Sequence, residues 1–284
     1  MRIWLALAAV VLATHAQLAL ADRDKLSGAP LPPQPPEKTS PIHDRFYVLA
    51  AFYPATVSTN VREDPTNAAP GTLGTPVNGE RDLGLASRLH QGRVEFMFRL
   101  RDRNKLRVEY FESDRTASQT LVNNIVFGNQ TFNAGQLVDS EINWRSMGLT
   151  YTYSFYRSDR FEVGSGLGLF FLQAEARGSI PATGQLQDES AADPFPTLPL
   201  DVTWAISRRF AATARGNYLK AKLNGIDGSY TDLHGDLQYR WNPYFSLGLG
   251  YTDMQITLTR NGGSTPGVVS LSFRGPEAFF RVSF

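Results

Sequence analysis

The sequence predicts an all-β protein, a transmembrane antiparallel up-and-down β-barrel of ten strands. Three observations lead to this prediction. From residue 45 onward, stretches of alternating apolar and polar residues recur without a sustained helical period. Short turns alternate with long loops between these stretches, and aromatic residues gather beside the short turns. After residue 21, no apolar run is long enough to span a bilayer as a helix, so any membrane crossing would use strands.

The N-terminal residues are expected to be a secretory signal peptide covering 1–21. An apolar run there ends in Ala19-Leu20-Ala21, which has the small residues of a cleavage site. A transmembrane anchor is the alternative, although polar residues interrupt the run. Residues 22–44 are then expected to form a proline-rich tail, and 45–284 the barrel domain.

Composition excludes several classes of site. The chain has no cysteine, which removes disulfides, lipid anchoring through a thiol and thiolate metal sites. Its formal net charge of +1 argues against a nucleic-acid partner, which would need a basic surface. We therefore expect no cofactor, no metal and no nucleic acid.

The alternation is clearest in YTDLHGDLQYRW, residues 230–241, where one face is mostly apolar and the other carries charge. Segments of this kind define the strands, since side chains in a strand point alternately to the two faces of the sheet. We expect strands at 45–58, 88–101, 104–117, 139–156, 160–177, 195–207, 209–223, 229–241, 244–259 and 267–284.

The connections differ in a regular way between the two ends of the expected barrel. RDRN, RSDR, SRR and WNPY are tight turns and fall at one end. The other end has long loops at 59–87, 118–138 and 178–194 and shorter ones at 224–228 and 260–266. Within 118–138, an apolar stretch is compatible either with an extra hairpin above the membrane, usable as a docking surface, or with a strand pair that prolongs the barrel.

Alternation alone does not say whether the apolar faces point into the barrel or toward lipid, so a soluble barrel with an apolar ligand stays an alternative. Two observations favour lipid. The polar faces carry Arg, Glu and Asp at matching depths on neighbouring strands. The apolar faces place Tyr153, Phe155, Trp241 and Tyr244 beside tight turns, where an interfacial aromatic girdle would lie.

The last strand pattern runs Phe280, Val282, Phe284. Together with the signal-like start, the absence of cysteine and the ten alternating segments, it resembles the small β-barrel proteins of Gram-negative outer membranes. The resemblance implies an outer-membrane location with the tail in the periplasm, and contact with outer-membrane lipid and lipopolysaccharide. It also implies that these three residues are the signal read by the barrel-assembly machinery. Oligomeric state and loop partners do not follow from it.

Earlier in the same strand, apolar residues occupy odd positions, whereas the apolar residues at the end of the strand occupy even ones. The switch falls at Gly275-Pro276. Because one extra residue flips every following side chain to the other face, we expect a β-bulge there.

Charged residues on the polar faces are expected to point into the lumen, where opposite charges would pair and plug the bore. A narrow solute pore is the alternative, although the lining has no single sign of charge. The expected lumenal residues are Arg93, Glu95, Arg99, Arg107, Glu109, Glu162, Asp201, Arg215, Asp236, Arg240, Glu277 and Arg281.

Asp232 and His234 share the inward face of one strand, and a carboxylate beside an imidazole can orient a general base. Outer-membrane proteases of the omptin type use such a couple opposite an acidic pair. Glu112 and Asp114 are the nearest candidates for that pair, but they form Glu-x-Asp where the family has two aspartates, and their register points them away from the lumen. Lipid-modifying barrels are a further enzyme class, for which the histidines lack a serine partner. We therefore predict a structural or surface-interaction role without catalysis.

Overall fold

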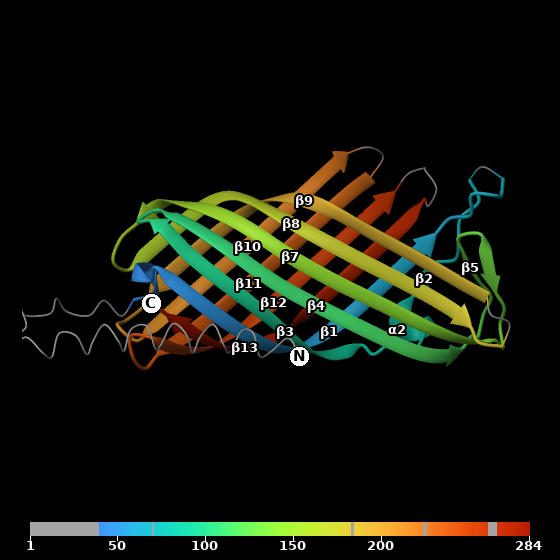
Figure 1. The fold of residues 1–284 in the computed structure, drawn as a ribbon, viewed down its shortest axis with the longest axis horizontal. Helices are drawn as coiled ribbons and strands as arrows, with labels where there is room; N and C mark the ends of the chain where they lie inside the picture. The colour runs from blue at the N-terminus through green and yellow to red at the C-terminus, as the bar shows by residue number, and fades with distance from the viewer. Residues whose placement is uncertain (1–39, 70, 183–184, 224–225, 261–265) are drawn as a thin grey trace, which may run out of the picture. The chain divides into compact units, whose positions relative to one another are not determined.

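A computed structural model describes residues 40–69, 71–182, 185–223, 226–260 and 266–284. The expected signal peptide at 1–21 and most of the expected tail at 22–44 lie outside these residues. The strands run obliquely along a closed barrel (Figure 1). In the described part of the chain, no helix is long and apolar enough to cross a membrane.

Ten long strands form the barrel, which confirms the expected number and order. Each pairs antiparallel with the next along the chain, and the last pairs with the first, so that the sheet closes. The strands are β1 (Phe46–Glu63), β3 (Arg88–Arg101), β4 (Asn104–Thr120), β7 (Leu137–Arg157), β8 (Phe161–Ile180), β9 (Gln185–Ala205), β10 (Phe210–Leu223), β11 (Ile226–Arg240), β12 (Phe245–Arg260) and β13 (Gly267–Ser283).

The two ends of the barrel are unequal, as expected. The short-turn end has connections of two to four residues, at 102–103, 158–160, 206–209 and 241–244. The long-loop end carries β2 (Val77–Asn78) and the short helix α2 (Gly79–Asp82) between β1 and β3. Unequal ends of this kind are typical of transmembrane barrels.

At the long-loop end, the structure decides between the two alternatives for 118–138 and corrects the loop predicted at 178–194. The connection between β4 and β7 holds a separate two-stranded sheet, β5 (Ile125–Phe127) with β6 (Gln130–Phe132), so the extra-hairpin alternative is the right one. The long loop predicted at 178–194 is wrong, because β8 continues to Ile180 and β9 begins at Gln185. Backbone hydrogen bonds between neighbouring strands need no apolar side chains, so a polar segment can prolong a hairpin.

The outer wall of the barrel changes character along its length. Toward the short turns, large apolar side chains stand exposed on it, among them Phe98, Leu149, Leu237 and Leu249, the last 70% exposed. Exposed aromatics lie beside the turns, including Trp204, Trp241 and Tyr244. Toward the long loops, most exposed outward residues are polar, such as Ser58, Asn60, Lys220 and Gln255, and Leu137 is an apolar exception. We call these parts the membrane tier and the outer tier; on β12 the boundary lies between Tyr251 and Asp253.

The lumen changes in the opposite sense. Within the membrane tier it buries charged side chains, whereas within the outer tier it buries an apolar core that includes Val57, Trp144, Ile256 and Leu271. The membrane tier is therefore largely polar inside and apolar outside. Its lumen also holds one apolar cluster of Tyr47, Leu49, Ala51, Met97 and Phe279. The outer tier is arranged like a water-soluble protein. Lipid around one tier and water around the other account for the inversion.

This inversion corrects the predicted bulge at Gly275-Pro276. The β13–β1 register is the same on both sides of it, since Phe52 faces Ala278 and Thr56 faces Arg274. The β12–β13 ladder passes through it without a shift. Leu271 and Phe273 therefore point inward, on the same side as Glu277. The apolar residues of β13 move from odd to even positions because the solvent around the barrel changes from water to lipid. The hydrogen-bond register of the strand stays the same.

Candidate functional site

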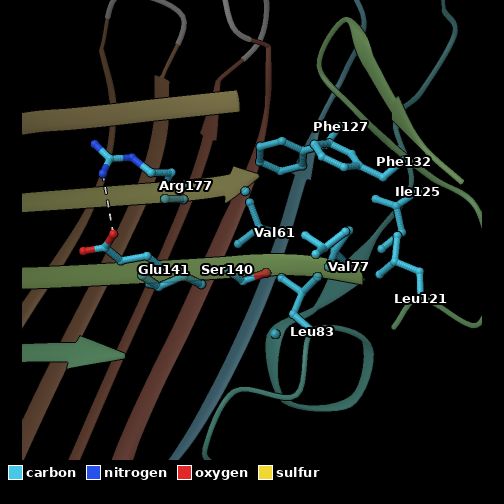
Figure 2. A pocket seen from close by; sticks show the side chains of 15 residues that line it. Val61, Val77, Leu83, Leu121, Ile125, Phe127, Phe132, Ser140, Glu141 and Arg177 are labelled. Carbon is cyan, nitrogen blue, oxygen red and sulfur yellow. Dashed lines mark ion pairs between the residues drawn. The ribbon is translucent and has the colours of Figure 1, made fainter. Parts of the chain in front are cut away.

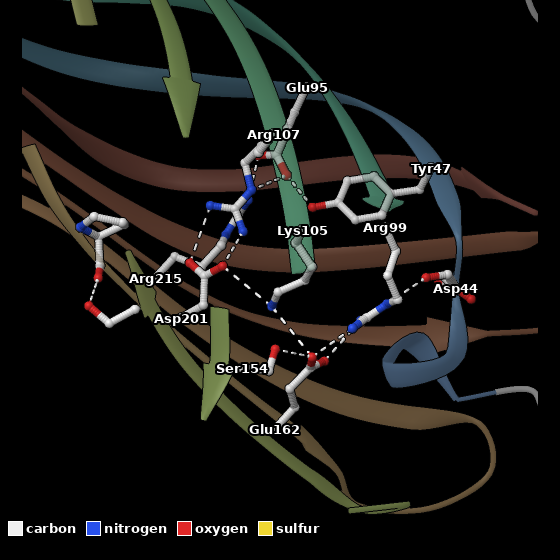
Figure 3. Close-up of polar contacts among 12 residues, drawn as sticks. Asp44, Tyr47, Glu95, Arg99, Lys105, Arg107, Ser154, Glu162, Asp201 and Arg215 are labelled. Atoms are coloured by element: carbon white, nitrogen blue, oxygen red, sulfur yellow. Dashed lines mark hydrogen bonds and ion pairs between the residues drawn. The ribbon is translucent and has the colours of Figure 1, made fainter. Parts of the chain in front are cut away.

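A buried carboxylate lies at the centre of the membrane-tier lumen (Figure 3). Glu95 is 0% exposed and pairs with Arg215, and the Tyr47 hydroxyl donates to it. Arg107 lies beside it, with Nε 3.3 Å from a Glu95 carboxylate oxygen. The Nη2 atom of Arg107 also lies 2.6 Å from Oδ2 of Asp201. Two acids and two arginines from four strands thus cross-link the barrel through its interior.

A second layer of pairs lies nearer the short turns. Arg99 donates from two nitrogens to the two carboxylate oxygens of Glu162, at 2.8 and 3.0 Å. The Lys105 ammonium lies 3.5 Å from Asp201 and 3.9 Å from Glu162, and so joins this layer to the first. The Ser154 hydroxyl also donates to Glu162. Fork-to-fork pairing of this kind fixes geometry as well as charge.

The segment before β1 forms the floor of the lumen. The short 3-10 helix η2 (Pro41–His43) buries Ile42 completely. Asp44 follows it and accepts from Nη1 of Arg240 at 2.8 Å, while Arg281 donates to the same carboxylate. Since Arg240 and Arg281 belong to β11 and β13, one carboxylate ties the entry of the chain to the last strands. The residues expected to end a tail therefore close the short-turn end.

The sequence analysis missed four members of this cluster. Tyr47, Lys105 and Ser154 lie on the inward face of their strands, so the alternation already indicated them. Asp44 lies before the first strand, outside any alternating pattern. The only signal near it is Ser40 followed by Pro41, a helix-start pattern, and the Ser40 side chain does accept from the backbone N–H of Ile42.

A third polar layer lies at the end of the membrane tier that is nearer the long loops. Asp232 and His234 are in contact, with Oδ1 and Nε2 2.8 Å apart. Arg93 lies 2.6 Å from Nδ1 of the same ring and pairs with Glu277 at 2.8 Å. The Thr252 hydroxyl lies 2.9 Å from both Nδ1 of His234 and Oε2 of Glu277. The histidine is thus enclosed by partners on several sides.

An aromatic layer covers this histidine on the side of the long loops. Tyr230 precedes Asp232 on β11 and is 2% exposed. Phe111 and Phe273 meet edge to face, with ring centroids 5.1 Å apart, and Phe170 packs on Tyr230 at 5.0 Å. These rings belong to the apolar core of the outer tier. A peptide approaching from the long-loop end would meet this packed core before it reached His234.

The structure does not bring the four catalytic candidates together. Asp232 and His234 are paired inside the lumen, whereas Glu112 and Asp114 point to the outer wall, as their register predicts. The Tyr110 hydroxyl, which is also outward, donates to Glu112. Glu112 and Asp114 do not face the Asp232–His234 couple, which Arg93 and Thr252 enclose as they would a structural hydrogen bond.

The expected lumenal residues all face the interior. Ten of the twelve are buried, whereas Glu109 and Asp236 are of intermediate exposure and line small interior cavities. The cavity beside Glu109 has a volume of about 20 Å³, and the one beside Asp236 about 40 Å³. Within the described ranges, no group of three or more His, Cys, Asp or Glu side chains is arranged to hold a metal ion.

Comparison with known proteins identifies the fold. The chain matches no family model and no curated protein. Among solved structures, it resembles the outer membrane protease OmpT from Escherichia coli, with a TM-score of 0.53, 8% identity, and 84% of this chain and 96% of that chain covered. The translocator domain of autotransporter NalP from Neisseria meningitidis aligns with a TM-score of 0.42 at 11% identity, covering 98% and 97%.

A third solved structure, the attachment invasion locus protein Ail of Yersinia pestis, aligns with a TM-score of 0.36 at 11% identity, covering 83% of this chain and 97% of that chain. The geometry is in accord with the first comparison, since ten antiparallel strands close into a barrel with an apolar outer band and unequal ends. The chain has the fold of the bacterial outer-membrane β-barrel proteins, in its ten-stranded form.

Proposed function

We propose that this protein is a closed outer-membrane barrel, a non-catalytic scaffold that carries its outer tier and hairpin on the cell surface. The observation that supports the proposal is the filling of the lumen at every level. Asp44 and η2 lie at the floor, two layers of ion pairs above them, the His234 cluster next, and the apolar core on top.

Among the described residues, these layers obstruct a path for a solute along the lumen. The interior cavities beside the ion pairs have volumes of about 20 and 40 Å³. A cavity needs about 10–15 Å³ to hold one water, so these have room for one to a few waters and not for a hydrated solute. Opening a path would break buried ion pairs, and each broken pair would leave a charge without its partner. Closure is therefore the stable state of this lumen.

The proposed role places the short turns in the periplasm and the long-loop end outside the cell. Fractionation tests the location, because the protein should stay with the outer membrane and migrate faster on a gel when unheated. Protease added to intact cells should then cut the 59–87 or 118–138 connections while the short turns stay protected. Recovery in the soluble fraction would contradict the membrane assignment.

Conductance tests the closed lumen. The wild-type barrel in planar bilayers should stay silent at high protein loading. A paired variant, Arg107→Ala with Asp201→Ala, removes both members of a central ion pair and should give small, reproducible conductance steps. Faster unheated migration confirms that the variant has folded. Regular steps from the wild type would overturn the proposal in favour of a pore.

A further inference from the structure

A third cavity lies at the long-loop end, apart from the lumenal charges. We call it the mouth pocket, and its main lining residues are Val77, Leu121, Ile125, Phe132, Val138 and Ser140 (Figure 2). Its volume is about 60 Å³, and it opens on one side. The walls come from β2, from the segments flanking the β5–β6 hairpin, from the hairpin itself and from the start of β7.

The walls are apolar although they belong to the outer tier, where water replaces lipid. Leu121 and Val138 are each 3% exposed, and Phe132 is 4% exposed. Leu83 and Phe127 pack against this cluster and also line the pocket. A concave apolar surface with few polar groups is the usual form of a small-molecule site.

One polar atom in this pocket has no partner. Ser140 is 4% exposed and lines the cavity, and its hydroxyl makes no hydrogen bond within the described part of the protein. Buried hydroxyls without a partner are rare, because each forfeits the hydrogen bonds it made to water. A molecule that occupied the pocket and offered one hydrogen-bonding atom would supply the missing partner.

The pocket is built before any ligand arrives, because its roof is anchored. Val126 exchanges two hydrogen bonds with Thr75, through its N–H to Oγ1 at 2.9 Å and its carbonyl oxygen to the Thr75 N–H at 2.8 Å. The Gly128 N–H donates to the Glu63 carbonyl at 3.2 Å. These bonds hold the β5–β6 hairpin on the connection after β1. A preformed site loses little conformational freedom on binding.

The charged residues next to the pocket point away from it. Glu141 and Arg177 face each other on β7 and β8 and form an ion pair at 3.6 Å on the outer wall, because the even-numbered residues of these strands face inward (Figure 2). The pocket therefore meets the Ser140 hydroxyl and apolar side chains. An uncharged ligand fits these walls.

We propose that the mouth pocket binds a small uncharged molecule from outside the cell, one aromatic ring in size and bearing a single hydroxyl, with that hydroxyl on Ser140. The pocket volume of about 60 Å³ is several times the roughly 10–15 Å³ that one water needs. One edge of an aromatic ring fits into the enclosed part, and the remainder of the ring lies in the open side of the pocket. This binding activity goes beyond the scaffold role, and it requires neither an open lumen nor catalysis.

Photolabelling tests the site. The full barrel in lipid nanodiscs is irradiated with a diazirine-bearing benzyl alcohol, and adducts are mapped by mass spectrometry. We expect adducts on residues 121–138 that excess benzyl alcohol displaces. Adducts on the lipid-facing wall arise by partition and should not be displaced. Leu121→Trp, which fills the pocket, should remove the displaceable adducts and keep the others.

The role of Ser140 is tested by comparing two competitors. In the wild type, benzyl alcohol should displace the probe better than toluene, which lacks the hydroxyl. Ser140→Ala should weaken displacement by benzyl alcohol about three- to tenfold, the usual contribution of one neutral hydrogen bond, and leave toluene unchanged. Ser58→Ala, at an exposed serine on the outer wall, is the matched control.

Three outcomes would overturn the proposal. The first is a wild-type protein without displaceable adducts on residues 121–138. The second is displaceable labelling that Leu121→Trp leaves intact in a folded barrel. The third is an unchanged preference for benzyl alcohol in Ser140→Ala, and this comparison stands even if the tryptophan variant fails to fold.

Discussion

At the residue scale, Glu95 shows how buried ion pairs connect strands across the lumen. Glu95 forms ion pairs with Arg215 and Arg107 and accepts a hydrogen bond from the Tyr47 hydroxyl, and its side chain is fully buried. A buried pair contributes modestly relative to an apolar replacement, but removing one partner leaves the other charge buried and unpaired. The neighbouring arginines therefore make this carboxylate a sensitive position of the membrane tier.

Glu95→Gln should lower the free energy of unfolding by about 3–5 kcal/mol, because two arginines lose a shared counter-charge while the side chain keeps its shape. Urea unfolding in lipid vesicles, followed by tryptophan fluorescence, measures the change. Asp102→Asn is the control, since that side chain is 89% exposed in a turn and should change stability by less than about 0.5 kcal/mol. Equal effects in the two variants would argue against a stabilising lumenal network.

At the same scale, alternation within each strand was enough to predict that Glu95, Arg107 and Arg215 face inward. It did not predict that they meet. Glu95 and Arg215 are 120 positions apart, and their contact depends on the stagger between strands across the closed barrel. Asp44 lay beyond any alternating pattern, so its place at the floor emerged only from the folded chain.

At the element scale, the β5–β6 hairpin is an addition to the barrel and not part of its wall. Its strands pair only with each other, and none of the barrel strands needs them to complete its ladder. Below the hairpin, Leu121 and Gln136 already bring the two barrel strands together, with the Leu121 N–H donating to the Gln136 carbonyl at 2.9 Å. The hairpin roofs the mouth pocket instead.

Replacing residues 122–134 by a short Gly/Ser linker should therefore leave the barrel closed. We expect the shortened protein to keep faster unheated migration, with a melting midpoint near that of the wild type, since loop length has a small entropic effect. The displaceable photolabelling of the mouth pocket should disappear in the same protein. Failure of the barrel to close would show that the hairpin is part of the folding unit.

At the scale of the whole molecule, the inversion between the tiers places the membrane. On β12, Leu249 and Gln255 point to the same outer wall, six residues apart, yet one faces lipid and the other water. The backbone is the same regular strand at both positions. The two positions differ in their distance from the short-turn end of the barrel, and so in the solvent they face.

Leu249→Arg should therefore lower the free energy of unfolding in vesicles by about 2–4 kcal/mol, the usual cost of an arginine on the lipid face near mid-membrane. Gln255→Arg should change it by less than about 1 kcal/mol, because water solvates the outer tier. Equilibrium unfolding of both variants in the same vesicles measures the difference. Similar costs at the two positions would show that the tier boundary is misplaced.

The sequence by itself determined the number and order of the strands and the side chains that share a face, because the two-residue period of a strand is a local property. It did not determine where β8 ends and β9 begins. The tertiary structure decided which face meets lipid, where that changes along β13, and which charges pair. Those outcomes depend on barrel closure, on strand stagger and on the solvent at each height. Phe273 and Glu277 illustrate the point, since both point inward on one strand, the first into an apolar core and the second onto Arg93.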